Sequence, residues 1–436
     1  MNNPVMKVLV LGGYGLIGRA IIAELIRQDF TVTGMGRIAE NGRKILPQLE
    51  WVGGDLHKLC TPDAWAEYLR DIDSVVNASG ALQTGLKDNL QKIQSDAIRA
   101  LINACETANI KHYIQISASG AAPEHSSEFL RTKGEADSAL RKSNLNWTIL
   151  KPGLVISSEA YGGTMLLRAL AAFPLVQPVI LPDAKIQAVA VEDVAKAVAM
   201  SLKDKKLSGK DFELVEQTGH TLQAVLLQFR QWLGFPTPAF VLPIPGLIGT
   251  ITAKIADLTG WFGWRSPLRT TAIKMLAQNV TGDPIPWEKA TGQKLNSLNR
   301  TLANIPSTGQ ERLFARMQLL FPFIVITLAL FWMASGIIGF MQYESAAMLV
   351  TPTLGKTNAL LSVLAGSTID CLIGLLLMFR RTFHAGCLAA IAVSIGYLAL
   401  GTILTPEFWL DPLGPLVKIF PGILLAIVGT TMAGER

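Results

Sequence analysis

The residues best suited to chemistry form a glycine-rich segment near the N-terminus. Residues 12–18 (GGYGLIG) follow a short apolar run at 5–11 and precede residues 19–28, whose apolar side chains recur at helical spacing. A strand, a glycine turn and a helix in this order bind the pyrophosphate of a dinucleotide, with amides at the helix N-terminus facing the phosphates. The predicted phosphate-binding residues are Gly12, Tyr14, Gly15, Leu16, Ile17 and Gly18.

The second predicted strand, residues 31–35, bears on the choice between the two nicotinamide cofactors. NAD-binding proteins usually place an acidic residue at the end of this strand, where it holds the ribose hydroxyls. Here Gly36 and Arg37 follow instead. An arginine can form a charge-assisted contact with a 2′-phosphate, so the sequence favours NADP(H) over NAD(H). The alternative is a solvated surface arginine.

Further strands are predicted at residues 49–52, 74–77, 113–116 and 147–150, and helical patterns alternate with them. Each strand leads into small or polar residues, and in doubly wound sheets the ligand lies outside these carboxyl ends. The predicted fold is therefore an α/β doubly wound Rossmann domain. The strand-end residues expected near the cofactor are Asp55, Leu56, Ala78, Ser79, Gly80, Ser117, Ser119, Pro152 and Gly153.

The C-terminal part has the composition of a membrane domain. Only 17% of the chain is charged, and residues 313–436 carry just eleven charged side chains. Four long apolar segments lie there, at residues 317–343, 357–379, 385–406 and 412–434. Each has the roughly 20 residues that a helix needs to cross a bilayer. We expect an all-α bundle of four transmembrane helices.

These patterns divide the chain into three parts. Residues 1–153 are the predicted NAD(P)-binding Rossmann core, and residues 154–312 the rest of the sheet with a small substrate-side lobe. Residues 313–436 are the membrane domain. Arginines precede the first apolar segment, separate the second from the third and end the chain. Because positive residues favour the cytoplasmic side, both termini and the Rossmann domain are expected in the cytoplasm.

Asp370 lies in the middle of the second apolar segment. A charge there costs ~2.5–3.5 kcal/mol on insertion scales. One interpretation is a polar group facing a cavity inside the bundle, for a proton or a lipid headgroup. The other is a packing residue, protonated or hydrogen-bonded, beside Ser367 and Thr368.

Several short motifs carry a family resemblance. The glycine pattern, Gly54-Asp55-Leu56, residues 77–80 (NASG), 116–120 (ISASG), 132–137 (TKGEAD), 147–153 (WTILKPG) and 191–195 (VEDVA) resemble an atypical or extended short-chain dehydrogenase/reductase. The chain is most similar to the group that includes the Rossmann accessory subunit of respiratory complex I. The C-terminal part resembles the DoxX-like membrane domain, and its fusion to a short-chain reductase resembles a known bacterial architecture. This resemblance implies a bacterial inner membrane. The resemblance implies adenine contact near Asp55 and Leu56, with residues 78–80 lining the cofactor.

The sequence departs from this family at its catalytic motif. Active members use Tyr-x-x-x-Lys, and the matching positions here are Phe129 and Lys133. Phenylalanine has no proton to give, so the usual proton relay is absent, while Lys133 is expected to bind the cofactor. The candidate catalytic side chains are Lys133, Ser117 and Ser119, although strict register places Ala118 at the serine position. Tyr161 could supply the proton from the substrate side, or serve only in packing.

Residues 243–264 are unusual for a soluble lobe. Ile248, Ile251, Ile255 and Leu258 align on one helical face, and three aromatic residues follow at 261, 262 and 264. The segment could touch the membrane interface or form a hydrophobic lid. Alternatively, the apolar stripe packs the helix against the protein body.

Composition narrows the functions that remain. The net charge of +6 comes with no polybasic run, so no nucleic-acid partner is expected. The four cysteines form no CxxC pair and the histidines show no ligand spacing, so no metal is expected.

One hypothesis is a membrane-tethered NADPH-dependent oxidoreductase acting on a lipophilic or quinone-like substrate. The other is a non-catalytic NADPH-binding sensor, or an assembly or stability factor for a membrane (respiratory) complex.

Overall fold

The computed structural model describes residues 6–81, 89–264 and 270–434. The chain divides into two compact units. The first comprises Met1–Lys254 and Pro267–Ala315, and the second Ile255–Ser266 and Arg316–Arg436. Two helices, α8 (Gly246–Trp261) and α12 (Gly309–Met341), carry the chain from one unit into the other.

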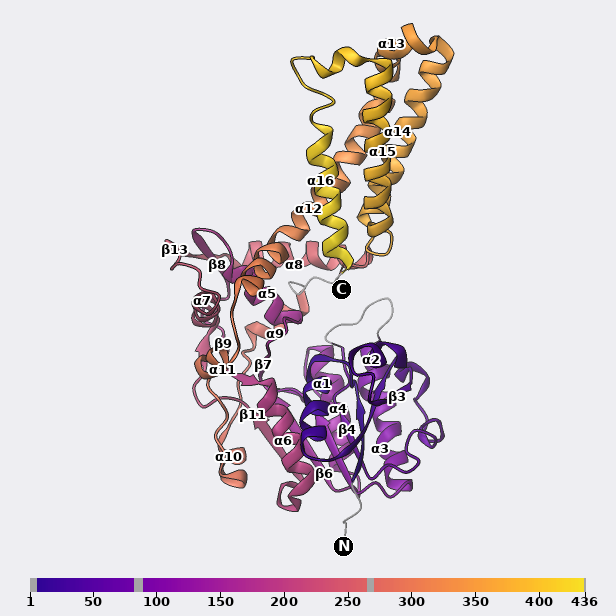
Figure 1. The fold of residues 1–436 in the computed structure, drawn as a ribbon. Helices are drawn as coiled ribbons and strands as arrows, with labels where there is room; N and C mark the ends of the chain where they lie inside the picture. Colours follow the sequence, from indigo (N-terminus) through magenta and orange to yellow (C-terminus); the bar gives the residue numbers. More distant parts are fainter. Residues whose placement is uncertain (1–5, 82–88, 265–269, 435–436) are drawn as a thin grey trace. The chain divides into compact units, whose positions relative to one another are not determined.

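The first unit is built on a seven-stranded sheet whose neighbouring strands are all parallel (Figure 1). Its order is β11-β6-β5-β4-β1-β2-β3. The chain runs outward from β1 to β3 and then returns to β4 on the other side of β1, so the strand order reverses between β1 and β4. This confirms the predicted doubly wound fold. The strands are β1 (Lys7–Leu11), β2 (Thr31–Gly36), β3 (Glu50–Gly53), β4 (Ser74–Asn77), β5 (His112–Ile116), β6 (Trp147–Pro152) and β11 (Lys210–Leu214).

Helices cover both faces of the sheet because side chains alternate along each strand. In β1, Val8 and Val10 pack with α1 (Leu16–Arg27) and α6 (Val191–Lys203). Leu9 and Leu11 face the other way and pack with α3 (Ala97–Thr107) and α4 (Glu128–Arg141). The short α2 (Ala39–Ile45) lies between β2 and β3 in the chain. The strand ends are thus held in a rigid three-layer frame.

The rest of the first unit is a small lobe with its own core around Phe229, Leu226 and Leu302. Three two-stranded sheets contribute to it, formed by β7 (Leu154–Ile156) with β10 (Ala188–Ala190), β9 (Lys185–Ile186) with β12 (His220–Thr221), and β8 (Val176–Ile180) with β13 (Phe240–Ile244). Its helices are α5 (Gly162–Ala171), α7 (Leu222–Trp232), α9 (Thr270–Ala277) and α11 (Leu298–Asn304). The short α10 (Ile285–Thr291) packs instead against β11 of the large sheet, where Trp287 contacts Phe212.

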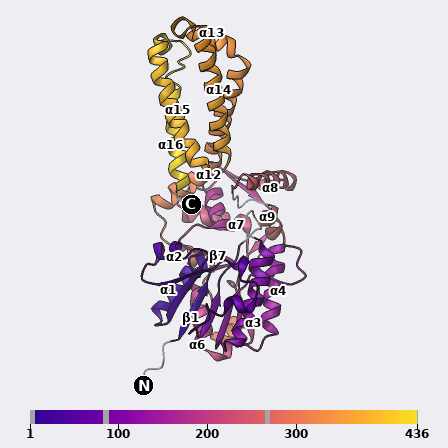
Figure 2. The same ribbon diagram turned by 90° about the vertical axis from the view of Figure 1, so that its right-hand side faces the viewer.

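The second unit is a bundle of long apolar helices (Figure 2). Three helices in the described residues are long and apolar enough to cross a membrane: α12, with 33 residues, α14 (Lys356–Met378), with 23, and α15 (Phe383–Leu404), with 22. The fourth, α16 (Ile419–Gly434), has only 16 residues. It is shorter than predicted because residues 412–418 form turns, in which Gly414 has a φ of 57°, outside the helical region. The short α13 (Tyr343–Leu354) was not predicted.

Asp370 is buried inside this bundle, with 5% of its surface exposed. The hydroxyls of Ser335 and Tyr397 donate to its two carboxyl oxygens at 2.6 and 2.7 Å. These bonds join α12, α14 and α15 through one polar group. Such an arrangement supports the packing interpretation of Asp370, since hydrogen bonding offsets the cost of burying a polar side chain.

Asp370→Ala is expected to lower the free energy of unfolding of the bundle by about 1–3 kcal/mol, because the hydroxyls of Ser335 and Tyr397 lose their acceptor. Asp370→Asn keeps the shape and one carbonyl oxygen, so its stability should stay close to that of the wild type. Thermal unfolding in detergent micelles measures both. An equally large loss in Asp370→Asn would mean that the carboxyl group itself has a role that the amide cannot replace.

Candidate functional site at the carboxyl edge of the sheet

The glycine motif forms a tight turn between β1 and α1. The amide of Gly15 donates to the carbonyl of Gly12 at 2.9 Å, and the amide of Arg19 donates to Gly15 at 2.9 Å. Gly12 has a φ of 69°, in the left-handed region that favours glycine. A Cβ on Gly18 would lie 2.2 Å from the Gly12 oxygen, so only glycine fits there. Gly15 is the N-cap of α1 and has no side chain to cap it, which leaves the first helical amides, of Leu16 and Ile17, suited to an anion.

The ends of β2 and β3 bring Arg37 and Asp55 near each other. Arg37 is exposed, and its backbone amide donates to the hydroxyl of Tyr14 at 3.1 Å. Asp55 begins a short 3₁₀ turn that contains Leu56, and its carboxylate accepts from the His57 amide and ring at 3.2 and 3.0 Å. Burial alone would raise the pKa of Asp55, but the His57 hydrogen bonds and the Arg37 charge outweigh it and lower the pKa. Asp55 is therefore ionised at neutral pH and able to accept from a ribose or adenine.

Lys133 lies where β4 and β5 end. It is buried in α4, and its Nζ donates to the carbonyl of Ile116, the last residue of β5, at 2.9 Å. The same Nζ is 3.6 Å from where a Cβ of Gly80 would be, so Lys133 adjoins the 78–80 turn. In that turn, the hydroxyl and amide of Ser79 both donate to Asn77. The structure thus brings the predicted lysine and the predicted cofactor-lining residues together.

Phe129, in place of the family tyrosine, is a packing residue here. It is 7% exposed and lies in a cluster with Leu90, Ile93 and Leu130. Its ring centroid is 5.9 Å from Lys133 Nζ. The position that would hold the proton donor is therefore occupied by an apolar ring, beside a lysine that is still present.

The two candidate serines both have protein partners. Ser117 is buried and donates to Oδ2 of Asp137 at 2.5 Å, and Ser119 donates to the carbonyl of Lys151 at 3.3 Å. Asp137 was missed by sequence analysis, although it lies in the 132–137 motif one helical turn after Lys133. Burial raises the pKa of Asp137 to about 6, against the Ser117 hydrogen bond and the Lys133 charge. The hydrogen bond to Asp137 directs the hydroxyl of Ser117 toward α4.

The pKa of Lys133 is lowered to about 8 by burial, although the charge of Asp137 opposes the shift. NAD(P)H affinity is expected to fall as pH rises through about 8, because the ammonium form, present below that pH, donates stronger hydrogen bonds than the neutral amine. Fluorescence titration on either side of this pH measures the effect.

Lys133→Met should bind the cofactor more weakly and lose this pH dependence. The control is Lys142→Met, which removes an exposed lysine just after the same helix and should change neither property. An unaltered pH profile in Lys133→Met would assign the titration to another group.

Pro152 and Gly153, two further predicted site residues, lie at the carboxyl edge of the sheet next to the lobe. Pro152 is the last residue of β6, and the amide of Gly153 donates to the carbonyl of Leu214 at the end of β11. Tyr161 is 64% exposed and serves as the N-cap of α5. The preceding loop contributes Glu159, which forms an ion pair with Arg19 at the start of α1. That pair was also missed, since its partners are far apart in sequence.

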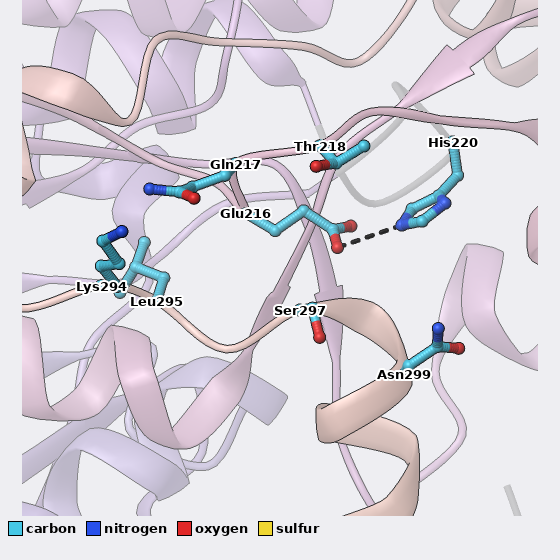
Figure 3. A pocket seen from close by; sticks show the side chains of 8 residues that line it. All are labelled: Glu216, Gln217, Thr218, His220, Lys294, Leu295, Ser297 and Asn299. Carbon is cyan, nitrogen blue, oxygen red and sulfur yellow. Dashed lines mark hydrogen bonds and ion pairs between the residues drawn. The ribbon is translucent and has the colours of Figure 1, made fainter.

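A separate pocket of about 310 Å³ lies where the chain leaves β11. Glu216 is buried in its wall and accepts from the amides of Ala188 and Leu298, both at 2.8 Å. Its carboxylate also contacts Nε2 of His220 at 3.2 Å (Figure 3). Sequence analysis missed this pocket because Glu216 and its partners belong to no shared motif. The carboxylate is fully used in holding the lobe together.

Comparison with known families agrees with this geometry. Residues 12–205 match the family described as NAD(P)H-binding, and residues 329–427 match the DoxX-like family. The chain belongs to the NAD(P)H-binding Rossmann proteins and carries a DoxX-like domain. The predicted fusion of the two is confirmed, and with it an NAD(P)H-binding domain joined to a membrane domain.

Three relatives of this NAD(P)H-binding protein illustrate the range of the family. Photosystem II assembly factor Ycf39 of Trieres chinensis is 23% identical over 272 residues, covering 59% of this chain and 77% of that factor. UPF0659 protein YMR090W of Saccharomyces cerevisiae is 31% identical over 176 residues, covering 38% and 75%. The mitochondrial NADH dehydrogenase (ubiquinone) 1 alpha subcomplex subunit 9 of Arabidopsis thaliana is 26% identical over 249 residues, covering 54% and 60%. The last confirms the predicted similarity to a complex I subunit.

A solved structure supports the fold of the NAD(P)H-binding domain. The NADPH-dependent quinone oxidoreductase QOR2 of Escherichia coli, in complex with NADPH, superposes with a TM-score of 0.53 and 18% identity. The match covers 68% of this chain and 98% of that chain. At this identity the likeness concerns the fold alone.

Proposed function

We propose that the chain is a membrane-tethered NADPH-dependent reductase whose substrate is lipophilic and quinone-like. The bound cofactor would supply a hydride, and together with one proton this hydride reduces a quinone to a quinol while NADPH becomes NADP⁺. The protein would bind and orient the cofactor at the carboxyl edge of the sheet. The proposal includes a bacterial inner membrane, with the Rossmann domain on the cytoplasmic side.

The observation that carries the proposal is that Lys133 lies beside Gly80, while Phe129 occupies the position at which active family members have the proton-donating tyrosine. The nicotinamide end of the site thus keeps its cofactor-binding lysine but has no protein acid at the family's position. Losing a positioned acid costs ~10²–10⁴-fold in rate for reactions that depend on it. A quinone oxygen can take its proton from water, so a quinone suits such a site better than an alcohol or a simple ketone.

The membrane bundle supports the lipophilic character of the substrate. Tethering confines the enzyme and a membrane-dissolved substrate to the same surface, which raises their encounter rate. The paired arginines 380 and 381, between α14 and α15, favour the cytoplasmic side for the ends of these helices. NADPH, which is made in the cytoplasm, would then reach the Rossmann domain directly.

The test is a single-turnover measurement on the full chain in nanodiscs. NADPH is bound first, then a short-chain or a long-chain quinone is added, and loss of nicotinamide absorbance is followed by stopped flow. We expect oxidation with quinones and none with simple ketones, and no oxidation with Lys133→Met at limiting NADPH. Tight NADPH binding without oxidation by any quinone or membrane lipid extract would overturn the reductase proposal.

A second candidate is a non-catalytic NADPH-binding protein that senses the cofactor or stabilises a membrane complex. It is favoured by the hydrogen bonds that both candidate serines, Ser117 and Ser119, donate to other protein groups. The similarity to an assembly factor and to a complex I subunit also supports it. This candidate predicts NADPH binding without turnover, together with co-purification of a membrane complex that is lost in a cofactor-binding variant.

A further inference from the structure

The last part of α8 has its side chains arranged in the opposite way to a soluble helix. Its small residues are inside, since Ala253 and Ala256 are buried. Its large apolar residues are outside: Ile255 is 57% exposed, Leu258 59% and Trp261 80%. A core-facing stripe would be buried instead, so the expectation that this stripe packs on the protein body is wrong. An exposed apolar patch of this kind marks an interaction surface.

The chain just after this helix is fixed to one end of the membrane bundle. The amide of Arg380 donates to the carbonyl of Phe262 at 2.9 Å, and the indole Nε1 of Trp264 donates to the carbonyl of Met378 at 2.7 Å. The Trp264 ring also packs edge-to-face on Phe383, with centroids 5.3 Å apart. Met378 ends α14 and Phe383 begins α15. Phe262 and Trp264 are therefore held at the level where two spanning helices end.

The residues around the ends of these helices are of the types that are typical of a membrane interface, namely tryptophan and arginine. The Arg380 guanidinium lies 5.6 Å from the Trp264 ring and within 3.4 Å of the Ala433 carbonyl, near the end of α16. Arg381 beside it is exposed. Tryptophan rings prefer the headgroup region, and basic side chains near the surface are attracted to anionic lipids. The exposed stripe of residues 255–261 comes directly before Phe262 and Trp264, the two residues that contact this end of the bundle.

We propose that residues 255–264 form an interfacial arm, which lies in the headgroup–acyl boundary of the lipid bilayer. Ile255, Leu258 and Trp261 enter the acyl region, and Phe262 and Trp264 attach the arm to the bundle. The arm is a lipid-binding surface in addition to the spanning helices, and it does not depend on the proposed reductase activity. It fixes the depth at which the chain leaves the bilayer.

The test uses the full chain in nanodiscs that contain an anionic lipid and a doxyl-labelled lipid. An environment-sensitive fluorophore is placed at Leu258→Cys or at Thr252→Cys, after Cys60, Cys105, Cys371 and Cys387 are changed to alanine. Thr252 is exposed and lies about 120° around the same helix from Leu258. The doxyl lipid should quench the label at Leu258→Cys several-fold more than the label at Thr252→Cys.

A second measurement keeps the native cysteines. Brominated lipids should quench wild-type tryptophan fluorescence more than that of Trp261→Phe, because Trp261 contributes a lipid-accessible ring. Equal quenching at the two labelled positions, or no difference for Trp261→Phe, would overturn the proposal. A label at Leu258→Cys in an apolar environment but out of reach of doxyl lipid would also overturn it, since a second copy or another protein would then cover the stripe.

Discussion

Gly18→Ala is expected to lower the affinity for NAD(P)H by about 5-fold to 150-fold, since overpacking costs ~1–3 kcal/mol. The added methyl group would lie 2.2 Å from the Gly12 carbonyl oxygen, a backbone atom that cannot move alone. Gly12 would have to shift, and with it the amides of Gly15 and Leu16 that face the phosphates. Fluorescence titration of the full chain with NADPH and NADH measures the loss, which should be similar for both cofactors.

The matched control is Gly246→Ala at the start of α8, where an added Cβ meets no atom within 4 Å. This variant should bind both cofactors as the wild type does. Circular dichroism should show that Gly18→Ala retains its helices, so that lost affinity is not lost folding. If Gly18→Ala binds NAD(P)H normally, the pyrophosphate does not lie at this turn and the whole site assignment fails.

The Rossmann core could be predicted because its signals are local. Each buried strand is a short apolar run that stops at small or polar residues, and these stops place Asp55, Ser79 and Ser117 at one edge of the sheet. The glycine turn is equally local, since Gly12 and Gly18 meet within seven residues. Such patterns need no knowledge of distant partners.

The residues that sequence analysis missed depend on distant partners. Asp137 carries no signal until α4 places it against Ser117, and Glu216 becomes a structural carboxylate only because Ala188 and Leu298 donate to it. The apolar stripe of α8 could be seen in the sequence, but the sequence does not show whether the stripe faces the protein or its surroundings. That direction depends on contacts between Trp264 and Met378, which are 114 residues apart.

Arg37→Ala is expected to weaken NADPH binding by about 10-fold to 150-fold while leaving NADH affinity almost unchanged, as a hydrogen bond to a charged group contributes ~1.5–3 kcal/mol. The geometry around β2 explains why. A Cβ on Gly36 would lie 2.0 Å from the Tyr14 ring, so the strand end has no room for the acidic side chain that NAD-binding proteins use. The next residue, Arg37, is exposed, and its charge lowers the pKa of Asp55 from the neighbouring strand end.

Lys44→Ala is the matched control, because it removes one exposed positive charge from the nearby α2. A general electrostatic effect would weaken NADPH binding in both variants to a similar degree. If Arg37 contacts the 2′-phosphate specifically, NADPH binding is weakened only in Arg37→Ala. The loss of NADPH affinity should then be smaller at high salt, which screens the attraction between the arginine and the phosphate. Equal losses for NADPH and NADH in Arg37→Ala would place the arginine at the pyrophosphate or adenine instead, and the chain would then have no preference for NADPH at this position.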